Sequence, residues 1–598
     1  MNNALMDRQH LSFLLEEVLQ VWQLRDWEAF ASQDGDDWLA VMDSAHHIAL
    51  QWFAPHHRLG DVEEPHVRDG KVVLPAQVEV ALAAYASAGF NAASAPVEHG
   101  GMGLPYVIAL ACDGLFMTAN IATSGYALLT RGAAHLLLAH GSSSQIRRFA
   151  EPLLEGRYFG TMCLSEPQAG SSLGDITTRA TPQPDGSYRV EGCKMWISGG
   201  EHEMGENIIH LVLARVVGDA PGVRGLSLFV VPRYHVLDDG SIGGRNDVRL
   251  AGLNHKLGQR GIVNTFLKFG EQGDCVAELV GQRGAGLTAM FHMMNEARIG
   301  VGMGAAMSGM AGYRYALRYA RERRQGRPLD QRDPTLPQVP IIEHPDIRRL
   351  LLRQRALVEG AHALCLFAGL QVDIKAHSPN DEARRQAAAL LDILTPIVKA
   401  WSSEFCVQAN DHAIQVLGGY GYTREYPVEL YWRDNRLNPI HEGTNGIQSI
   451  DLLGRKVMQD QGAGLKRLVS FIEETCAQVG SEWLPFSDAL RALTVSVQQA
   501  VELTAERLTR HGPTRALANA HDFLVACGHC VVAALWLRQA LAAERLADTA
   551  DSPFLSGKRK TAIYFWRYEL PVAEVAIQRV LEGEESALNV LDNEFGEM

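Results

Sequence analysis

The sequence of 598 residues predicts a multidomain α+β protein, in which helical regions flank a central β region. Two changes of pattern predict this order. Helical periodicity rich in Ala and Leu gives way to short alternating or apolar runs at Thr161, and long helical periodicity returns after Val280. A chain of this length is too long for one compact domain. The expected domains are an N-terminal helical domain (1–158), a β domain (159–283), a helical bundle (284–460) and an appended all-α domain (461–598).

The N-terminal helical domain is indicated by stretches such as "VEVALAAYASAGF" and "GYALLTRGAAHLLLAH", with Gly and Pro mostly at the joints. The β domain follows from "GSYRVEGCKMWISGG", "NIIHLVLARVV" and "GLSLFVVPR", which turn signals such as "PDG" and "DDG" separate. Its size suits a small barrel or sandwich. The sequence has no repeating βα unit or strand-bound Gly-rich loop, so a Rossmann cofactor domain is disfavoured.

Three or four long helices are predicted in the third region, from segments such as "HPDIRRLLLRQRALVEGAHALCLFAGL". After the joint "DQGAGLKR", helical periodicity continues to the C-terminus, with breaks at His511–Pro513 and Asp551–Pro553. Within this last region, "GKRKTAIYFWRYELP" is either a membrane patch or a core helix with a charged rim. Aromatic stripes at helical spacing usually pack inward, which favours the core helix.

Composition excludes some classes of function. The chain has 69 acidic and 55 basic side chains, a formal net charge of -14, and no extended basic stripe with interleaved aromatics, so we expect no nucleic-acid partner. The N-terminus lacks a secretory pattern. The longest apolar run, Phe523–Leu537, contains His529 and is shorter than the ~20 residues that span a bilayer. We therefore expect a buried helix there and no transmembrane segment.

The nine cysteines are scattered through the chain, which suits a reducing compartment and predicts a cytoplasmic location. Cys527 and Cys530 form a C-x-x-C, but no second Cys/His pair lies at zinc-finger spacing. We expect two small core residues there and no metal site.

Two motifs in the β region suit a planar, polar ligand. In "MCLSEPQAGSSLGD", Gly170, Ser171 and Ser172 offer close backbone approach, N–H groups and hydroxyls, although a plain turn would look similar. In "GCKMWISGGEHE", Trp196 and Ser198 offer an aromatic face and a hydrogen bond, although a strand tryptophan is more often core.

Later motifs leave similar alternatives. Arg298 and Arg323 are either solvated charges or forks for phosphate groups. The "GGYGY" loop is either a close-approach loop or a joint between helices. Glu442, the single carboxylate of "PIHEGTNGIQ", would by itself be a solvated loop residue.

Taken in order, "LSEPQAGS", "KMWIS", "LGQRGIVNTFL", "QVLGGYGYTREYPVELYWRD" and "HEGTNGIQ" make roughly Phe90–Met458 resemble the acyl-CoA dehydrogenase family. The resemblance implies a helical N-terminal domain, a middle β domain and a C-terminal four-helix bundle. It also implies FAD, held between the β domain and the second helical domain. The order of the segments agrees with the order read from periodicity.

The resemblance assigns roles to particular residues. Glu442 matches the catalytic base, and Gly443 beside it allows the backbone geometry that directs a donor at the thioester carbonyl. Arg298 matches a position near the acyl-CoA entrance. Four departures from the family pattern are Ser172, His441, Gly446 and, in "RRQGR", the absence of the usual phenylalanine before the glycine. The positions that match contacts to the flavin ring or the substrate are Met162, Leu164, Ser165, Gly170, Ser171, Trp196 and Ser198. Arg323, Gln415 and Gly419 match positions that reach the FAD of the neighbouring subunit, and Thr444 matches a position that faces the cofactor.

The implied reaction is α,β-dehydrogenation of a medium- or long-chain fatty acyl-CoA to a trans-2-enoyl-CoA, the first step of β-oxidation. Glu442 would remove the α-hydrogen, flavin would accept the hydride, and electron-transfer flavoprotein would receive the electrons. The long form is similar to bacterial fatty-acyl-CoA and 3-methylmercaptopropionyl-CoA dehydrogenases. The alternatives are a 3-methylmercaptopropionyl-CoA dehydrogenase, an acyl-CoA oxidase and a catalytically silent acyl-CoA-binding protein. Since the appended domain of long members covers the surface that shorter members use to form tetramers, we expect a homodimer.

Overall fold

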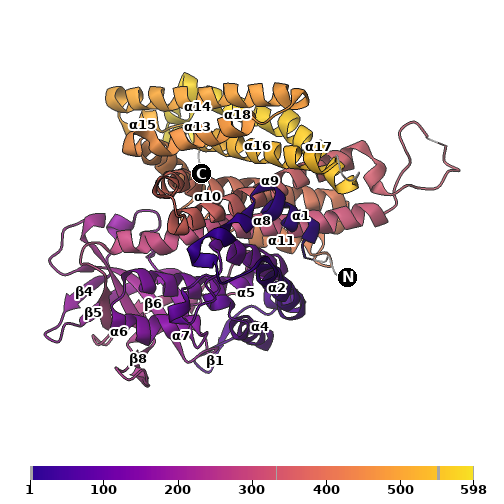
Figure 1. Ribbon diagram of the computed structural model, residues 1–598. Coiled ribbons are helices and arrows are strands. Elements are labelled where there is room, and N and C mark those ends of the chain that lie inside the picture. Colours follow the sequence, from indigo (N-terminus) through magenta and orange to yellow (C-terminus); the bar gives the residue numbers. More distant parts are fainter. Residues whose placement is uncertain (1–4, 332, 548–551, 597–598) are drawn as a thin grey trace. The chain divides into compact units, whose positions relative to one another are not determined.

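The computed structural model describes residues 5–331, 333–547 and 552–596 (Figure 1). The chain forms two compact units, one of Gln33–Gly300 and one of Met1–Ser32 with Val301–Met598. The first unit holds helices and the β domain, and the second is helical. This multidomain architecture, mostly helical with a β domain in the middle of the chain, confirms the predicted fold class.

The first unit is organised around the long helix α5 (Tyr106–His140), whose residues are nearly all buried. The backbone leaves helical geometry at Asn120 (φ −165°, ψ 92°), where Asn120 Oδ1 accepts a hydrogen bond from the Thr123 N–H at 3.1 Å. This side chain caps the second half of α5, so the helix resumes directly after the break. The other α-helices of four or more residues that lie wholly in this unit are α2 (Gly35–Ile48), α3 (His57–Val62), α4 (Ala76–Ser87) and α7 (Glu151–Leu154).

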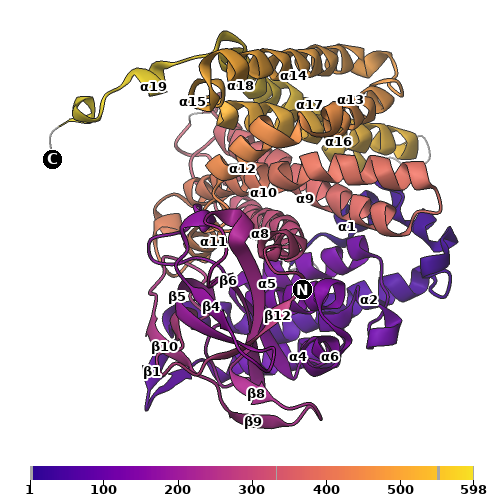
Figure 2. The same cartoon turned by 90° about the vertical axis from the view of Figure 1, so that its left-hand side faces the viewer.

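The β domain is a barrel. Hydrogen-bonded pairs connect β5 to β12, β12 to β7, β7 to β6, β6 to β4, and β4 back to β5, which closes a ring of strands. Figure 2 shows β4, β5, β6 and β12 side by side. Strands β10, β11 and β3 extend the same sheet. The strands are β3 (Tyr158–Cys163), β4 (Arg179–Pro182), β5 (Tyr188–Ser198), β6 (Asn207–Val216), β7 (Leu226–Pro232), β10 (Val248–Leu253), β11 (Asn264–Phe269) and β12 (Val276–Val280); two hairpins pair β1 (His66–Arg68) with β2 (Lys71–Val73) and β8 (Tyr234–Val236) with β9 (Ile242–Arg245).

The second unit contains the predicted bundle and the appended helices. Helices α9 and α10 pack along each other, and α16 packs against α9, α10, α12, α13, α14, α17 and α18. Figure 1 shows α13, α14, α16 and α18 together in one helical layer. The main helices are α8 (Gly286–Glu322), which begins within the first unit, α9 (Pro345–His377), α10 (Asp381–Leu417), α11 (Val428–Asn435), α12 (Asn445–Asp451), α13 (Ala463–Cys476), α14 (Leu484–His511), α16 (Ala520–Ala547), α17 (Pro553–Tyr564) and α18 (Leu570–Glu582); α1 (Arg8–Ser12) also belongs to this unit.

The central position of α16 follows from its composition, since a helix that is apolar on all sides belongs in a core. The whole run Phe523–Leu537 is buried, as predicted, and the thiols of Cys527 and Cys530 lie inside it. The break at His511–Pro513 separates α14 from α15 (Pro513–Ala516). Asp551, at the second predicted break, lies outside the described residues.

Three helical segments of the described chain are long and apolar enough to cross a membrane by length and composition: Tyr106–His140, Pro345–His377 and Pro513–Ala547. Their apolar windows are 100%, 83% and 89% buried by the rest of the protein. This burial favours the core of the protein over lipid as their surroundings. The absence of a transmembrane segment stays a prediction.

The segment "GKRKTAIYFWRYELP" covers the later part of α17, the turn of π-helix that follows it and the first two residues of α18, and Phe565 and Trp566 pack inward as in a core helix. The predicted charged rim is wrong for Lys558, which is fully buried. Its Nζ donates to Glu359 Oε2 at 2.8 Å, His10 Nδ1 at 2.7 Å and Gln539 Oε1 at 2.9 Å. Burial lowers the pKa of Lys558 to about 8, against the opposing charge of Glu359. Lys558 therefore ties together α1, α9, α16 and α17.

Candidate active site

The loop after β3 is held to the barrel by a buried ion pair. Lys194 of β5 is completely buried, and its Nζ donates to Glu166 Oε1 at 3.0 Å and to the Leu164 carbonyl at 2.9 Å. Glu166 also accepts hydrogen bonds from the backbone and hydroxyls of Thr177 and Thr178, at 2.6–3.0 Å. Burial alone would raise the pKa of Glu166, but Lys194 and these donors lower it to about 2. The sequence motifs contain both charged residues, but their pairing was not predicted.

This ion pair fixes a loop whose tip is open. Leu164 is buried and Met162 is half-buried, whereas Gly170 and Ser171 are exposed. An added Cβ at Gly170 would meet no atom within 4 Å, so another molecule can approach the backbone there. The Met195 N–H donates to the Ser165 carbonyl at 2.9 Å, which brings the loop beside β5.

Trp196 lies at an irregularity of β5. In the pairing of β5 with β11, Lys194 lies opposite Leu267 and Ile197 lies opposite Thr265. Two residues of β5, Met195 and Trp196, therefore face a single residue of β11, which is a β-bulge. Trp196 takes a left-handed backbone (φ 66°) and is 61% exposed. A β-bulge re-aims a side chain, and here it turns the indole outward. The alternative that Trp196 is a core residue is wrong.

Ser198 lies two residues after Trp196, at the end of β5. Its Oγ accepts a hydrogen bond from Asn264 Nδ2 at 3.1 Å, and Asn264 Oδ1 accepts one from Asn254 Nδ2 at 2.7 Å. The end of β5 thus carries an exposed indole and a fixed hydroxyl, and the open Gly-Ser loop after β3 is bonded to the same strand through Met195. These residues suit the face and polar edge of a flat heterocycle.

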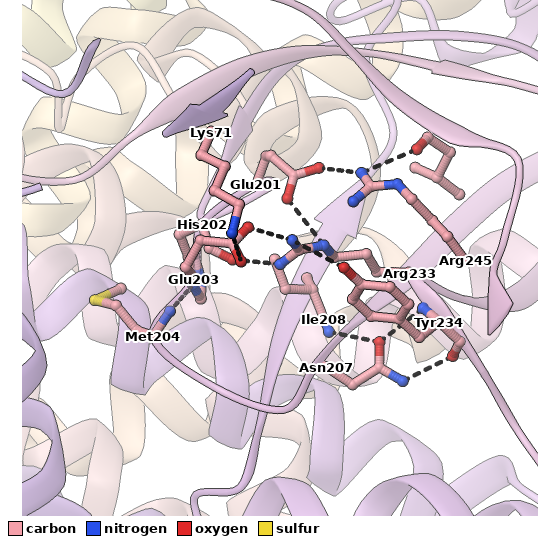
Figure 3. Close-up of polar contacts among 11 residues, drawn as sticks. Lys71, Glu201, His202, Glu203, Met204, Asn207, Ile208, Arg233, Tyr234 and Arg245 are labelled. Atoms are coloured by element: carbon pink, nitrogen blue, oxygen red, sulfur yellow. Dashed lines mark hydrogen bonds and ion pairs between the residues drawn. The ribbon is translucent and has the colours of Figure 1, made fainter. Parts of the chain in front are cut away.

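An ion cluster fixes the chain immediately after Ser198 (Figure 3). Arg233 Nε lies 2.9 Å from Glu201 Oε1, and Arg245 Nη2 lies 2.6 Å from Glu201 Oε2. Arg233 also bonds Glu203 and the His202 carbonyl. Burial, and then the charge of Arg233, lower the pKa of His202 to about 3, so this imidazole is neutral. The sequence offered only the acidic pair of "GGEHE" as a signal of this cluster.

Glu442, in the second unit, occupies a strained turn. Its backbone is left-handed (φ 55°), as is that of Gly443 (φ 84°). Non-glycine residues in this region are uncommon and cluster at functional sites. The buried Gln448 Nε2 donates to the Glu442 carbonyl at 3.0 Å, and Thr444 Oγ1 accepts a bond from the Ile447 N–H at 3.4 Å as the N-cap of α12. The turn is therefore held from the helix that follows it.

His441 and Gly446 lie on either side of this carboxylate. His441 is half-buried, and its Nε2 lies 3.1 Å from Asn438 Oδ1. Burial, and then the charge of Lys399, lower the pKa of His441 to about 3. His441 thus stands beside Glu442 as a neutral ring, and Gly446 is exposed.

The remaining predicted residues fall into two places. The Arg323 guanidinium lies 5.3 Å from the Tyr420 ring centroid, next to exposed Gly419, and Gln415 is exposed at the end of α10. Thus Arg323 and the "GGYGY" loop are brought together. Arg298 of the first unit is 5% exposed, with its guanidinium 5.8 Å from the Phe291 ring, so it is not a solvated charge. The predicted contacts of all these residues with FAD or acyl-CoA stay predictions.

Comparisons with known proteins agree with this geometry. Family models described as the acyl-CoA dehydrogenase middle domain and C-terminal domain match residues 161–270 and 284–458, and one described as acetyl-CoA dehydrogenase C-terminal like matches residues 468–590. The chain is 36% identical to 3-methylmercaptopropionyl-CoA dehydrogenase of Ruegeria pomeroyi, over 97% of this chain and 98% of that protein. The chain belongs to the acyl-CoA dehydrogenase family. It is an FAD-dependent enzyme of that family, and the open loop with Trp196 and Ser198 suits a flavin ring.

Other acyl-CoA dehydrogenases resemble it along nearly the whole chain. The broad-specificity linear acyl-CoA dehydrogenase FadE5 of Mycobacterium tuberculosis is 32% identical over 98% of this chain and 97% of its own. The acyl-CoA dehydrogenase of Bacillus anthracis, solved with FAD, superposes with a TM-score of 0.75 at 19% identity, covering 94% of this chain and 90% of that one. Caenorhabditis elegans ACDH-11, solved with C11-CoA, has a TM-score of 0.75 at 18% identity, covering 99% and 96%. At these identities, the two structures show a shared fold.

Proposed function

We propose that the protein catalyses α,β-dehydrogenation of an acyl-CoA, with Glu442 as the base that removes the α-hydrogen. The observation that carries this proposal is the placement of one carboxylate on a left-handed turn fixed by Gln448, in a chain of this family. Bound FAD supplies a hydride acceptor. A second carboxylate is then not required.

A thioester α-hydrogen is weakly acidic, so Glu442 needs help as a base. Exclusion of water by a bound acyl chain raises the pKa of a carboxylate and makes it more basic. A donor directed at the thioester carbonyl typically contributes ~3 kcal/mol. In this proposal the backbone N–H of Glu442 is one such donor, which gives the strained turn at this residue a role in catalysis.

The test replaces Glu442 by glutamine, which keeps the size of the side chain and removes its basicity. Turnover of the preferred acyl-CoA should fall by at least ~10³-fold with FAD content unchanged, within the range for removing a positioned base. Glu343→Gln, which changes an exposed carboxylate of the same unit, should have wild-type turnover. Near-normal turnover in Glu442→Gln would exclude Glu442 as the base.

For the substrate, we propose a medium- or long-chain linear acyl-CoA, and hence a role in fatty-acid β-oxidation. The similarity to FadE5 along the whole chain supports a linear acyl chain. The 36% identity to a 3-methylmercaptopropionyl-CoA dehydrogenase supports a second candidate, in which a thioether replaces a methylene of a short chain. Anaerobic flavin bleaching with butyryl-, octanoyl-, palmitoyl- and 3-methylmercaptopropionyl-CoA separates them. The highest kcat/KM for the methylthio compound would replace the first candidate by the second.

We also propose a cytoplasmic homodimer that passes electrons to electron-transfer flavoprotein. The resemblance of the long form to other family members supports the homodimer and the electron acceptor, and the scattered cysteines support the cytoplasmic location. Light scattering of the FAD-loaded protein should give the mass of two chains, and a tetramer would contradict this. Rapid hydrogen peroxide formation without an added acceptor would instead indicate an acyl-CoA oxidase.

A further inference from the structure

The turn that carries Glu442 is closed by Asn445. We call residues Pro439–Asn445 the active-site turn. The Asn445 N–H donates to the Pro439 carbonyl at 3.1 Å, which joins the two ends of this turn. Asn445 is also the first residue of α12, the helix that holds Glu442 through Gln448. The orientation of Asn445 thus determines where the turn sits.

The side chain of Asn445 uses its whole hydrogen-bonding capacity on α10. Its Oδ1 accepts bonds from Lys399 Nζ at 3.0 Å and Ser403 Oγ at 3.1 Å, and both donors are fully buried. Its Nδ2 donates to the Ala400 carbonyl at 3.2 Å and to Glu404 Oε2 at 3.5 Å. An amide has two acceptor and two donor positions, so all four are occupied. A bond from a buried ammonium group is among the stronger hydrogen bonds.

Glu404 carries the connection beyond α10. Its Oε1 lies 3.2 Å from Nε2 of His521, near the start of α16. Helix α12 also packs directly against both α10 and α16. Helix α16 belongs to the appended helical region, residues 461–598. The active-site turn is therefore supported by a bundle helix on one side and, through Glu404, by the appended region.

We propose that Asn445 is a positioning residue that fixes the active-site turn and so places the Glu442 carboxylate. Through Glu404 and His521, the appended helical region supports the same turn. This inference rests on the proposed role of Glu442 as the base. It gives the appended region a part in catalysis, because a displacement of ~1 Å in a reacting group can cost ~10²-fold in rate.

The main test replaces Asn445 by alanine in the FAD-loaded, full-length enzyme. We expect kcat to fall by about 10- to 100-fold while KM and FAD content change by less than about threefold, because the substrate and flavin contacts outside this turn remain. Hydrogen exchange of the amides of residues 442–448 should accelerate by at least about tenfold. Asn380→Ala, which removes the N-cap of α10, the helix that the Asn445 side chain bonds, is the matched control and should change neither kcat nor this exchange rate.

Asn445→Asp covers the case in which Asn445→Ala does not fold, and His521→Ala tests the connection to the appended region. Asn445→Asp keeps the oxygen that accepts from Lys399 and Ser403, but it sets a second oxygen against the Ala400 carbonyl and the Glu404 carboxylate. We therefore expect it to lower kcat as well. His521→Ala changes a half-exposed side chain and should lower kcat by about two- to fivefold in the wild type but not in Asn445→Ala, because connected residues are not additive. Arg579→Gln removes the ion pair with Asp522, beside His521, and should leave kcat unchanged.

The outcomes separate this inference from the proposed function. Wild-type turnover in Glu442→Gln would overturn the role of Glu442 itself. If Glu442→Gln is inactive but Asn445→Ala and Asn445→Asp keep kcat within about twofold of wild type, Asn445 does not position the base. Additive losses in the double variant of Asn445 and His521 would overturn the connection to the appended region.

Discussion

Replacing Lys558 by methionine should open α17 locally. Lys558 Nζ donates to Glu359, His10 and Gln539 at 2.7–2.9 Å in a fully buried site. Removing one partner of a buried ion pair costs about 3–5 kcal/mol. Because Arg355 Nε still lies 2.9 Å from Glu359, the uncompensated charge is smaller, and we expect about 3 kcal/mol, at the lower end of that range.

Amide hydrogen exchange along α17 measures this cost, since it reports the free energy of local opening. A loss of about 3 kcal/mol corresponds to exchange more than about 100-fold faster. Lys560→Met makes the same chemical change at an exposed position of the same helix, and surface substitutions usually stay within about 0.5 kcal/mol. If the two variants exchange at the same rate, the buried lysine contributes nothing beyond an ordinary surface residue, and the reasoning is refuted.

Two more predictions concern the loop and the indole of the barrel. Trp196→Ala should lose most bound FAD, seen as a fall in visible absorbance per chain, with little change in the thermal stability of the FAD-free protein because the side chain is 61% exposed; Trp52→Ala, another partly exposed tryptophan of the first unit, should keep its FAD. Glu166 has a pKa lowered from 4.5 to about 2, so its stabilisation is complete above pH 4.5 and is lost as the pH falls toward 2. Near-UV circular dichroism should show this loss in the wild type, and equal pH dependence in Glu166→Gln would contradict it.

Much of the fold could be predicted from local pattern. The strands of the β domain, the burial of Phe523–Leu537 and the break at His511–Pro513 all follow from periodicity and turn residues, which act over a few positions. The closure of the barrel could not be predicted in this way. It depends on β4, a strand of four residues that pairs with both β5 and β6.

The candidate site shows the same limit. Glu442 stands out only through a motif, and the left-handed backbone of Trp196 and Glu442 has no local signal, since glycine is the residue expected there. Lysine is almost never fully buried unless it is paired. Lys194 and Lys558 are buried because each is paired with a carboxylate. These carboxylates lie 28 and 199 positions away in the sequence. Such partners meet only in the folded chain.

The closing strand of the barrel has a practical consequence for engineering this enzyme. The loop that begins after β3 leads into β4, which pairs with β5. The buried ion pair between Glu166 of this loop and Lys194 of β5 also holds the loop to the barrel. Exchanging only the exposed Gly-Ser tip for that of a relative leaves both anchors in place. Moving the loop with Glu166 into a protein that lacks the equivalent of Lys194 would bury a carboxylate without its counter-charge. The ring of strands would then be weakened at β4, which closes it. Loop, strand and lysine should therefore be transplanted as one module.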